Sequence, residues 1–194
     1  MTSDVRPQHR RALTAAAEVI ARVQPGDLSR PTPCASWDLQ ALLAHMIGQN
    51  GGFALAVSTG DAEVSHYAPV IWPDELGAAW TQSVHEVLTA FDKADPGRQV
   101  RLVEVNPDGT FPAAVVVGMH LLDTVIHTWD VANSLGWPFR PDHELVDIVA
   151  AQSERVPAGT ARARPGAAFA PATTTTETDP WPRALAMLGR SNPA

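Results

Sequence analysis

The stretch from residue 120 to residue 130 reads His120-Leu-Leu-Asp123-Thr-Val-Ile-His127-Thr-Trp-Asp130. Its ionisable residues follow one another at spacings of 3, 4 and 3, which places them along one stripe of an α-helix. No Lys, Arg or Glu occurs between Phe111 and Ser134, so the rest of this helix is apolar on nearly every side and is predicted to be buried. Two histidines and a carboxylate on one stripe of a buried helix need partners, and this pattern resembles a metal site.

The stripe has an alternative interpretation as the solvent face of an ordinary amphipathic helix. Such faces are usually built from Lys, Glu, Arg and Gln, whose long stems and helix propensity suit water, and none of these residues occurs here. The pair Asp123-x-x-x-His127 is weak by itself, because two ligands do not hold a divalent ion. The metal hypothesis therefore depends on a third ligand from elsewhere in the chain.

The candidate for that third ligand is His45, which lies in a segment that begins as a helix does. Ser36 is predicted to be the N-cap, and Asp38 lies in the first turn, where its charge favours the helix dipole. His45 lies at the edge of an apolar face made by Leu39, Leu42, Leu43, Met46 and Ile47. Two interpretations stay open, a hydrogen-bonded core histidine and the third ligand of a site with free positions for water or substrate.

Further helices are predicted on both sides of these two segments. Apolar spacing, prolines and glycines indicate helices over residues 7–23, about 37–58, from Pro73 to the Asp95-Pro-Gly sequence, from Pro112 onward, 141–153 and 181–188. Residues 101–105 are expected to be extended, and the Ala-, Pro-, Gly- and Thr-rich stretch after Pro157 is expected to be loop. Three histidines outside the stripe are expected at the surface: His9, His85 and His143.

These motifs carry a family resemblance. The sequence Pro31-Thr-Pro-Cys-Ala-Ser-Trp-Asp-Leu, followed by Leu-Leu-Ala-His45 and later by Asp123-x-x-x-His127-Thr-Trp-Asp-Val-Ala and Gly136, resembles the DinB-like metal-binding superfamily. Within it the chain is similar to the branch typified by the N-terminal domain of mycothiol-dependent maleylpyruvate isomerase. The C-terminal Phe169-Ala-Pro and the run from Arg183 to Arg190 resemble the closing segment of small single-domain members, so the resemblance covers almost the whole chain.

The resemblance implies an all-α, DinB-like four-helix bundle with a loop-rich C-terminal tail. It also implies a divalent metal, most often zinc or nickel, with the ligands falling on His45, Asp123 and His127. Two departures matter. The isomerase has a second, C-terminal domain that this chain is too short to contain, so maleylpyruvate isomerisation itself is not expected. Asp123 is also one methylene shorter than the isomerase's glutamate, which leaves the ligand chemistry intact.

The leading functional hypothesis is a metal-dependent enzyme of the thiol transferase or isomerase type, with mycothiol as the co-substrate and a small metabolite as substrate. The alternatives are metal-assisted hydrolysis or cyclisation of a small metabolite and a non-catalytic site that only stabilises the bundle. His120 and His66 are the candidate catalytic residues, His120 through contact with substrate or a ligand and His66 as a general base. Cys34, the single cysteine, is interpreted as structural rather than as a nucleophile.

Composition fits one domain over residues 1–194, because 194 residues with 45% hydrophobic content supply one good core. The net charge of −7 argues against a nucleic-acid partner. No run of about 18 apolar residues predicts a membrane span, and no signal peptide is recognised at the N-terminus, so a cytoplasmic location is expected. A homodimer is predicted from the superfamily.

Overall fold

The computed structural model describes residues 4–34, 36–157, 160–163 and 169–191. In chain order the elements are α1 (Arg6–Ile20), η1 (Pro25–Asp27), α2 (Leu39–Thr59), η2 (Val64–Tyr67), α3 (Leu76–Lys93), β1 (Gln99–Val100), β2 (Phe111–Pro112), α4 (Ala113–Ser134), α5 (His143–Ser153), η3 (Thr160–Ala163) and α6 (Pro180–Met187). Within these ranges the sheet consists of two strands of two residues each. The predicted all-α class is confirmed.

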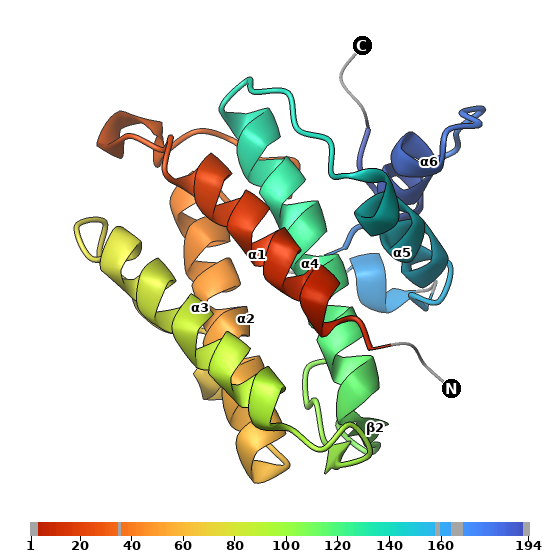
Figure 1. The fold of residues 1–194 in the computed structure, drawn as a ribbon. Helices are drawn as coiled ribbons and strands as arrows, with labels where there is room; N and C mark the ends of the chain where they lie inside the picture. The colour runs from red at the N-terminus through yellow and green to blue at the C-terminus, as the bar shows by residue number, and fades with distance from the viewer. Residues whose placement is uncertain (1–3, 35, 158–159, 164–168, 192–194) are drawn as a thin grey trace.

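Helices α1 to α4 form the bundle, and α4 is the helix at its centre. Helix α1 packs on α4, and α2 packs on both α3 and α4. Figure 1 shows α1 crossing α4, with α2 and α3 together on one flank and α5 and α6 on the other. Of the 22 residues of α4, 16 are buried, as its apolar sequence predicts. A polar side chain at one of these buried positions needs a partner inside the protein.

Two apolar clusters hold these helices together. The larger one fills the bundle and includes Leu42, Phe53, Phe91 and Val117. The smaller one joins α4 to α5 and α6 and includes Ile126, Trp129, Val149, Trp181 and Leu185. Full burial of a side chain of this size contributes about 1.5–3 kcal/mol. Because α4 contributes to both clusters, the C-terminal helices are fixed against the same helix that carries the ionisable stripe.

The start of α2 differs from the prediction. Asp38 rather than Ser36 is the N-cap, and its carboxylate accepts the N–H of Ala41 at 2.9 Å. The chain before α2 is held by an isolated antiparallel bridge between Pro31 and Asp38, so this segment enters the helix in extended conformation. The correction places Ser36 outside the helix and leaves the predicted apolar face of α2 unchanged.

The extended segment also lies at another place than predicted. Strand β1 ends at Val100 and pairs antiparallel with β2, whereas residues 103–105 form a turn. Val100 and Leu102 are buried, while Val105 is about half exposed. Burial of these two side chains fixes the position of the extended segment, which the local sequence alone did not indicate. The loop-rich tail is confirmed, because irregular backbone leads from η3 to α6 in the described residues.

Two glycines of α2 allow η2 to lie directly on the helix. A Cβ atom on Gly48 would lie 2.1 Å from the carbonyl oxygen of Tyr67, and one on Gly52 would lie 2.3 Å from its ring. The Tyr67 side chain is buried, with its ring 6.1 Å from that of Phe53. A backbone carbonyl cannot turn away as a flexible side chain can, so any larger residue at Gly48 must displace η2.

Gly48→Ala is therefore expected to lower the free energy of unfolding by about 2 kcal/mol, because overpacking outweighs the roughly 1 kcal/mol that alanine gains over glycine in a helix. Gly77→Ala in α3 is the matched control, since a Cβ atom there meets nothing within 4 Å. It should raise the free energy of unfolding by up to about 1 kcal/mol. Urea titration measures both changes. Stabilisation by both variants would mean that η2 does not rest on Gly48.

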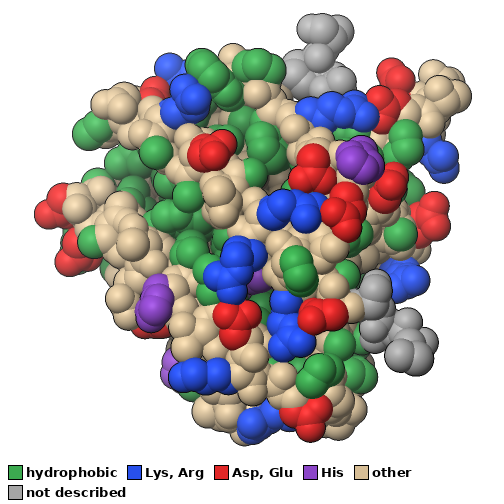
Figure 2. All heavy atoms as spheres, in the orientation of Figure 1, with side chains coloured by type: hydrophobic (Ala, Val, Ile, Leu, Met, Phe, Trp, Pro, Cys, Tyr) green, Lys and Arg blue, Asp and Glu red, His purple; other side chains and the backbone are tan. Residues whose placement is uncertain are grey.

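Charged side chains of both signs are interspersed on the face shown in Figure 2. Ion pairs between Arg10 and Asp92 and between Arg11 and Glu144 link α1 to α3 and to α5. These pairs are about half exposed, so each contributes little to stability. In the described part of the chain no helix combines the length and hydrophobicity that crossing a bilayer requires.

Candidate metal centre

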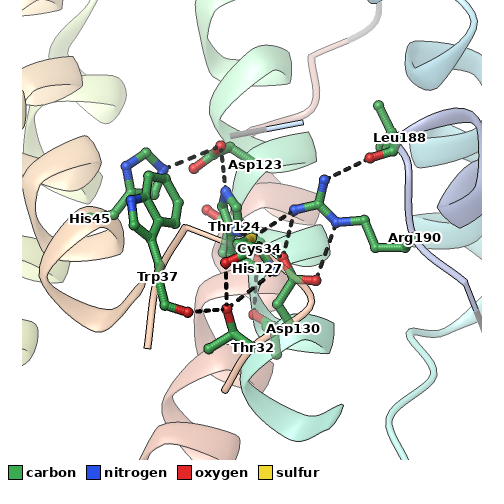
Figure 3. A network of polar contacts seen from close by, with 11 residues as sticks. Thr32, Cys34, Trp37, His45, Asp123, Thr124, His127, Asp130, Leu188 and Arg190 are labelled. Carbon is green, nitrogen blue, oxygen red and sulfur yellow. Dashed lines mark hydrogen bonds and ion pairs between the residues drawn. The ribbon is translucent and has the colours of Figure 1, made fainter. Parts of the chain in front are cut away.

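The structure brings together His45 from α2 and Asp123 and His127 from α4 (Figure 3). One ligand atom from each of the three lies within 4.8 Å of the other two. Nε2 of His127 lies 3.3 Å from Oδ1 of Asp123, and Nε2 of His45 lies 3.9 Å from the same oxygen. The i, i+4 spacing on α4 points both of its side chains to one side, where α2 presents His45.

Both histidines present a buried nitrogen that lacks a hydrogen-bond partner. Nε2 of His45 and Nε2 of His127 are shielded from solvent, and neither makes a hydrogen bond of acceptable geometry. An unsatisfied buried polar atom is costly, so such atoms usually have a function or an additional partner. Two imidazole nitrogens and a carboxylate oxygen form a donor set that suits a divalent transition metal. The three side chains, called the His45–Asp123–His127 trio below, therefore fit the metal that the sequence predicted.

The trio lies at an edge of the bundle rather than in its centre. The side chain of His127 is fully buried, whereas those of His45 and Asp123 are 15% and 14% exposed. The indole of Trp37 covers one side, with its ring centroid 4.4 Å from that of His45 and 6.0 Å from that of His127. One side of the trio is thus closed by an aromatic ring, and part of the His45 and Asp123 side chains reaches the surface.

The electrostatics of the trio are those of a paired acid and base. Burial raises the pKa of the Asp123 carboxyl, but the positive charge of His127 and the nearby His45 outweigh it and hold the pKa below its ordinary value. Burial lowers the pKa of His127, but Asp123 and the hydrogen bond to Asp130 raise it well above its ordinary value. A divalent cation at the trio would take the place of the imidazolium proton. Metal binding there should therefore release a proton and weaken at low pH.

Asp130 orients His127 from the other side of the imidazole ring. Its Oδ2 accepts the Nδ1 hydrogen of His127 at 2.8 Å, and its side chain is fully buried. A carboxylate on the far nitrogen of a metal-ligating histidine fixes the tautomer and the ring orientation. Asp130 belongs to the same ionisable stripe of α4 as Asp123 and His127, and this hydrogen bond allows it to orient the imidazole.

A second group of ligand types lies beside the trio. The Sγ atom of Cys34 is 3.2 Å from Oδ2 of Asp130 and 3.8 Å from Nδ1 of His127. Arg190 lies against the same group, because it donates to both oxygens of Asp130, at 3.2 and 2.7 Å, and to Sγ of Cys34 at 3.1 Å. A guanidinium at these atoms repels a second cation. The position of Arg190 therefore disfavours this group as another metal site.

His120 and His9 form a buried pair between α4 and α1. Nε2 of His9 lies 2.8 Å from Nδ1 of His120, and both residues are 1% exposed. The ring of Phe91 contacts both imidazoles. The expectation that His9 lies at the surface is wrong, whereas His85 and His143 are exposed as expected. The structure thus brings His120 to His9 and to a packed aromatic environment.

His66 lies on the exposed helix η2, where its Nδ1 is 3.3 Å from the carbonyl oxygen of Glu63. It is outside the group of ligand atoms that meet at the trio. Cys34 is buried next to Arg190 and Asp130, and its structural role stays a prediction.

Two residues next to the trio were not predicted, and both follow α5 in the chain. The ring of Phe169 is stacked on that of His127 at 6.0 Å and 12° between the planes, and the guanidinium of Arg190 lies 5.3 Å from the centroid of Phe169. The sequence around Arg190 offers one local signal, a glycine at position 189 that is typical of a helix end. That signal says nothing of the partner across the fold.

Comparisons with known proteins agree with this architecture. The family model of the mycothiol maleylpyruvate isomerase N-terminal domain matches residues 9–132, a range that contains the whole trio and ends before Phe169 and Arg190. Two uncharacterized proteins, from two strains of Mycobacterium tuberculosis, are each 31% identical to this chain over 140 residues, which is 71% of this chain and 70% of theirs.

Solved structures show the same fold. Crystal structures of the mycothiol-dependent maleylpyruvate isomerase and of a histidine-to-alanine mutant of it superpose with TM-scores of 0.58 and 0.57. Each match covers 76% of this chain and 68% of the isomerase at 16% identity, so it bears on the fold alone. The extent of the family match and the identity to the mycobacterial relatives go further. The chain belongs to the mycothiol maleylpyruvate isomerase N-terminal domain family, within the DinB-like metal-binding superfamily.

Proposed function

We propose that the protein is a divalent-metal-dependent enzyme of the mycothiol-dependent transferase or isomerase type, acting on a small metabolite. The observation that carries this proposal is the pair of unpartnered Nε2 atoms, on His45 and His127, directed at Asp123 in a member of this family. Three protein ligands are typical of catalytic rather than structural zinc sites. Zinc is the first expectation for this donor set and nickel the second.

The residues around the trio support a site that is open to a small molecule. The partial exposure of His45 and Asp123 disfavours a purely structural site, which would be closed by a fourth protein ligand. A bound divalent ion would supply Lewis acidity and would lower the pKa of a thiol or a water placed on it. The protein's own contribution is to fix the imidazole of His127 through Asp130 and to shield one side of His45 with Trp37.

Other predictions from the sequence concern two histidines, the domain, the assembly and the location. The catalytic roles of His120 and His66 stay predictions. The contact between His120 and His9 favours a packing role for His120. The single domain, the homodimer and the cytoplasmic location also stay predictions. Hydrolysis or cyclisation of a small metabolite would use the same three ligands, and the next experiment separates that chemistry from thiol transfer.

Addition of mycothiol to the cobalt-substituted protein is expected to produce an intense sulfur-to-cobalt charge-transfer band. Direct bonding of sulfur to cobalt adds an absorption that nitrogen and oxygen ligands lack, and the trio leaves positions for it. The S-methyl thioether of mycothiol is the matched control, because it has nearly the same shape and no thiolate. Absence of the band at millimolar mycothiol, with cobalt bound and accessible to water, would rule out thiol transfer in favour of hydrolytic or cyclising chemistry, or of a metal site without catalysis.

A further inference from the structure

Arg190 connects the C-terminal segment to the Nδ1 side of His127. Arg190 is 3% exposed, and its guanidinium makes two hydrogen bonds to the carboxylate of Asp130, from Nε to Oδ1 at 3.2 Å and from Nη2 to Oδ2 at 2.7 Å. Figure 3 shows the two planar groups facing each other beside His127. A two-point contact of this kind fixes orientation as well as distance. The carboxylate that holds His127 is therefore itself held in one orientation.

The orientation of Asp130 decides which nitrogen of His127 can bind a metal. When Nδ1 carries the hydrogen and donates it to Asp130, the lone pair of the neutral imidazole is on Nε2. Nε2 is the atom that lies 3.3 Å from Asp123. Without an acceptor at Nδ1, the imidazole could carry its hydrogen on Nε2 and would lose its ligand atom.

The backbone at the end of α6 places Arg190 where this contact forms. The N–H of Gly189 donates to the carbonyl of Ala186, and the N–H of Arg190 donates to that of Leu185, which is the Schellman arrangement at a helix end. Gly189 has φ of +79°, and a Cβ atom there would lie 2.6 Å from Cβ of Ala170. Only glycine meets both demands, so this turn directs the next side chain back to α4.

The same guanidinium reaches a third part of the chain. Nη2 of Arg190 donates to Sγ of Cys34, in the extended segment that leads into α2. Helix α2 carries His45, and α4 carries the other two members of the trio. One side chain from the segment after α6 thus contacts the two segments that bring all three candidate ligands together. Each of these contacts joins Arg190, which lies outside the family match, to a residue within residues 9–132.

We propose that Asp130 and Arg190 are positioning residues of the metal centre, with Arg190 acting through Asp130 to present Nε2 of His127 to the metal. The segment after α6 is then a functional part of the centre and more than a cover for the apolar core. This inference rests on the proposed metal site and is independent of whether mycothiol is the co-substrate.

The test measures zinc affinity by chelator competition and the visible spectrum of the cobalt protein for Asp130→Asn, Arg190→Gln and the double variant. Arg140→Gln is the control, since Arg140 makes a two-point contact with Asp179 at the start of α6, in an exposed pair away from the trio. Thermal melting of the metal-free proteins reports on folding. The double variant guards against misfolding of Arg190→Gln, because it removes the buried charge of Asp130 together with its partner.

Each single variant is expected to weaken zinc binding about 10- to 100-fold, as removal of outer partners of metal-bound histidines does, and to shift the cobalt absorption bands. The double variant should bind zinc no more weakly than Asp130→Asn, because Arg190 acts through Asp130. Arg140→Gln should bind like the wild type.

If the folded double variant binds zinc with wild-type affinity and has an unchanged cobalt spectrum, the positioning role is wrong. The metal site itself would not be affected by that result. Additive losses from the two substitutions would overturn the route through Asp130. A wild-type protein that binds no zinc or cobalt would overturn this inference together with the metal site.

Discussion

Purified protein is expected to contain one divalent transition metal per chain, and His45→Ala, Asp123→Ala or His127→Ala should each reduce that content to background. Removing one of three protein ligands leaves two, and two ligands do not hold a divalent ion against dilution and chelators. Since loss of an outer partner alone costs about 10- to 100-fold in affinity, loss of a ligand should cost about 100-fold or more. Elemental analysis after gel filtration measures the result.

His120→Ala is the control for this experiment, because it removes a histidine from the same helix, three residues before Asp123. Nδ1 of His120 lies 2.8 Å from Nε2 of His9, so His120 is engaged away from the trio, and most of the metal should remain. Full metal occupancy after loss of His45, Asp123 or His127 would remove that residue from the ligand set. Loss of metal in His120→Ala, with the helical content intact, would add His120 to the set.

The features of the site that could be predicted are those that depend on residue spacing within a single helix. The spacing of Asp123 and His127 fixes their common side on α4, and the absence of long charged side chains around them indicates burial. His45 required the additional assumption that α2 packs beside α4, which the family resemblance supported. Packing of α2 on α4 makes that assumption correct.

The burial of His9 could have been predicted from the same kind of spacing. Leu13 and Ala16 lie on the buried face of α1, and His9 precedes them at i−4 and i−7 on that face. Its polar ring suggested the surface, but a partner on α4 allows burial. Burial of a polar side chain requires a hydrogen-bond partner, and the partner of His9 is His120 on another helix.

The contact of Arg190 with Asp130 could not be predicted in this way. The two residues are 60 positions apart, and irregular backbone separates α6 from the helices before it. The sequence indicates that α6 ends near Gly189, but not where α6 docks. The position of α6 on α4 is determined by the apolar cluster that includes Trp129, Trp181 and Leu185. That position brings Arg190 next to Asp130. Long-range polar contacts of this kind require the assembled fold.

The pair of His9 and His120 should make stability fall steeply in mild acid. Burial lowers the pKa of His120 to about 4, and burial and the neighbouring His120 and Arg10 lower that of His9 well below its ordinary value. Well above pH 6.5 both rings are neutral in the folded and unfolded chain, so the stability is complete there. As the pH falls from 6.5 towards 4, the unfolded chain binds protons that the folded chain excludes, and the free energy of unfolding decreases.

Each pKa unit corresponds to about 1.4 kcal/mol, so His120 alone should cost about 3 kcal/mol by pH 4. His9→Gln should reduce the slope of unfolding free energy against pH between 6.5 and 4.5, because the amide can donate to Nδ1 of His120 and does not titrate. His85→Gln, which removes an exposed histidine from α3, is the control and should keep the wild-type slope. Titratable groups of the trio are present in all three proteins, so their contribution cancels in the comparison. Urea unfolding at stepped pH gives the slopes, and equal slopes for His9→Gln and the wild type would show that the buried pair does not govern acid stability.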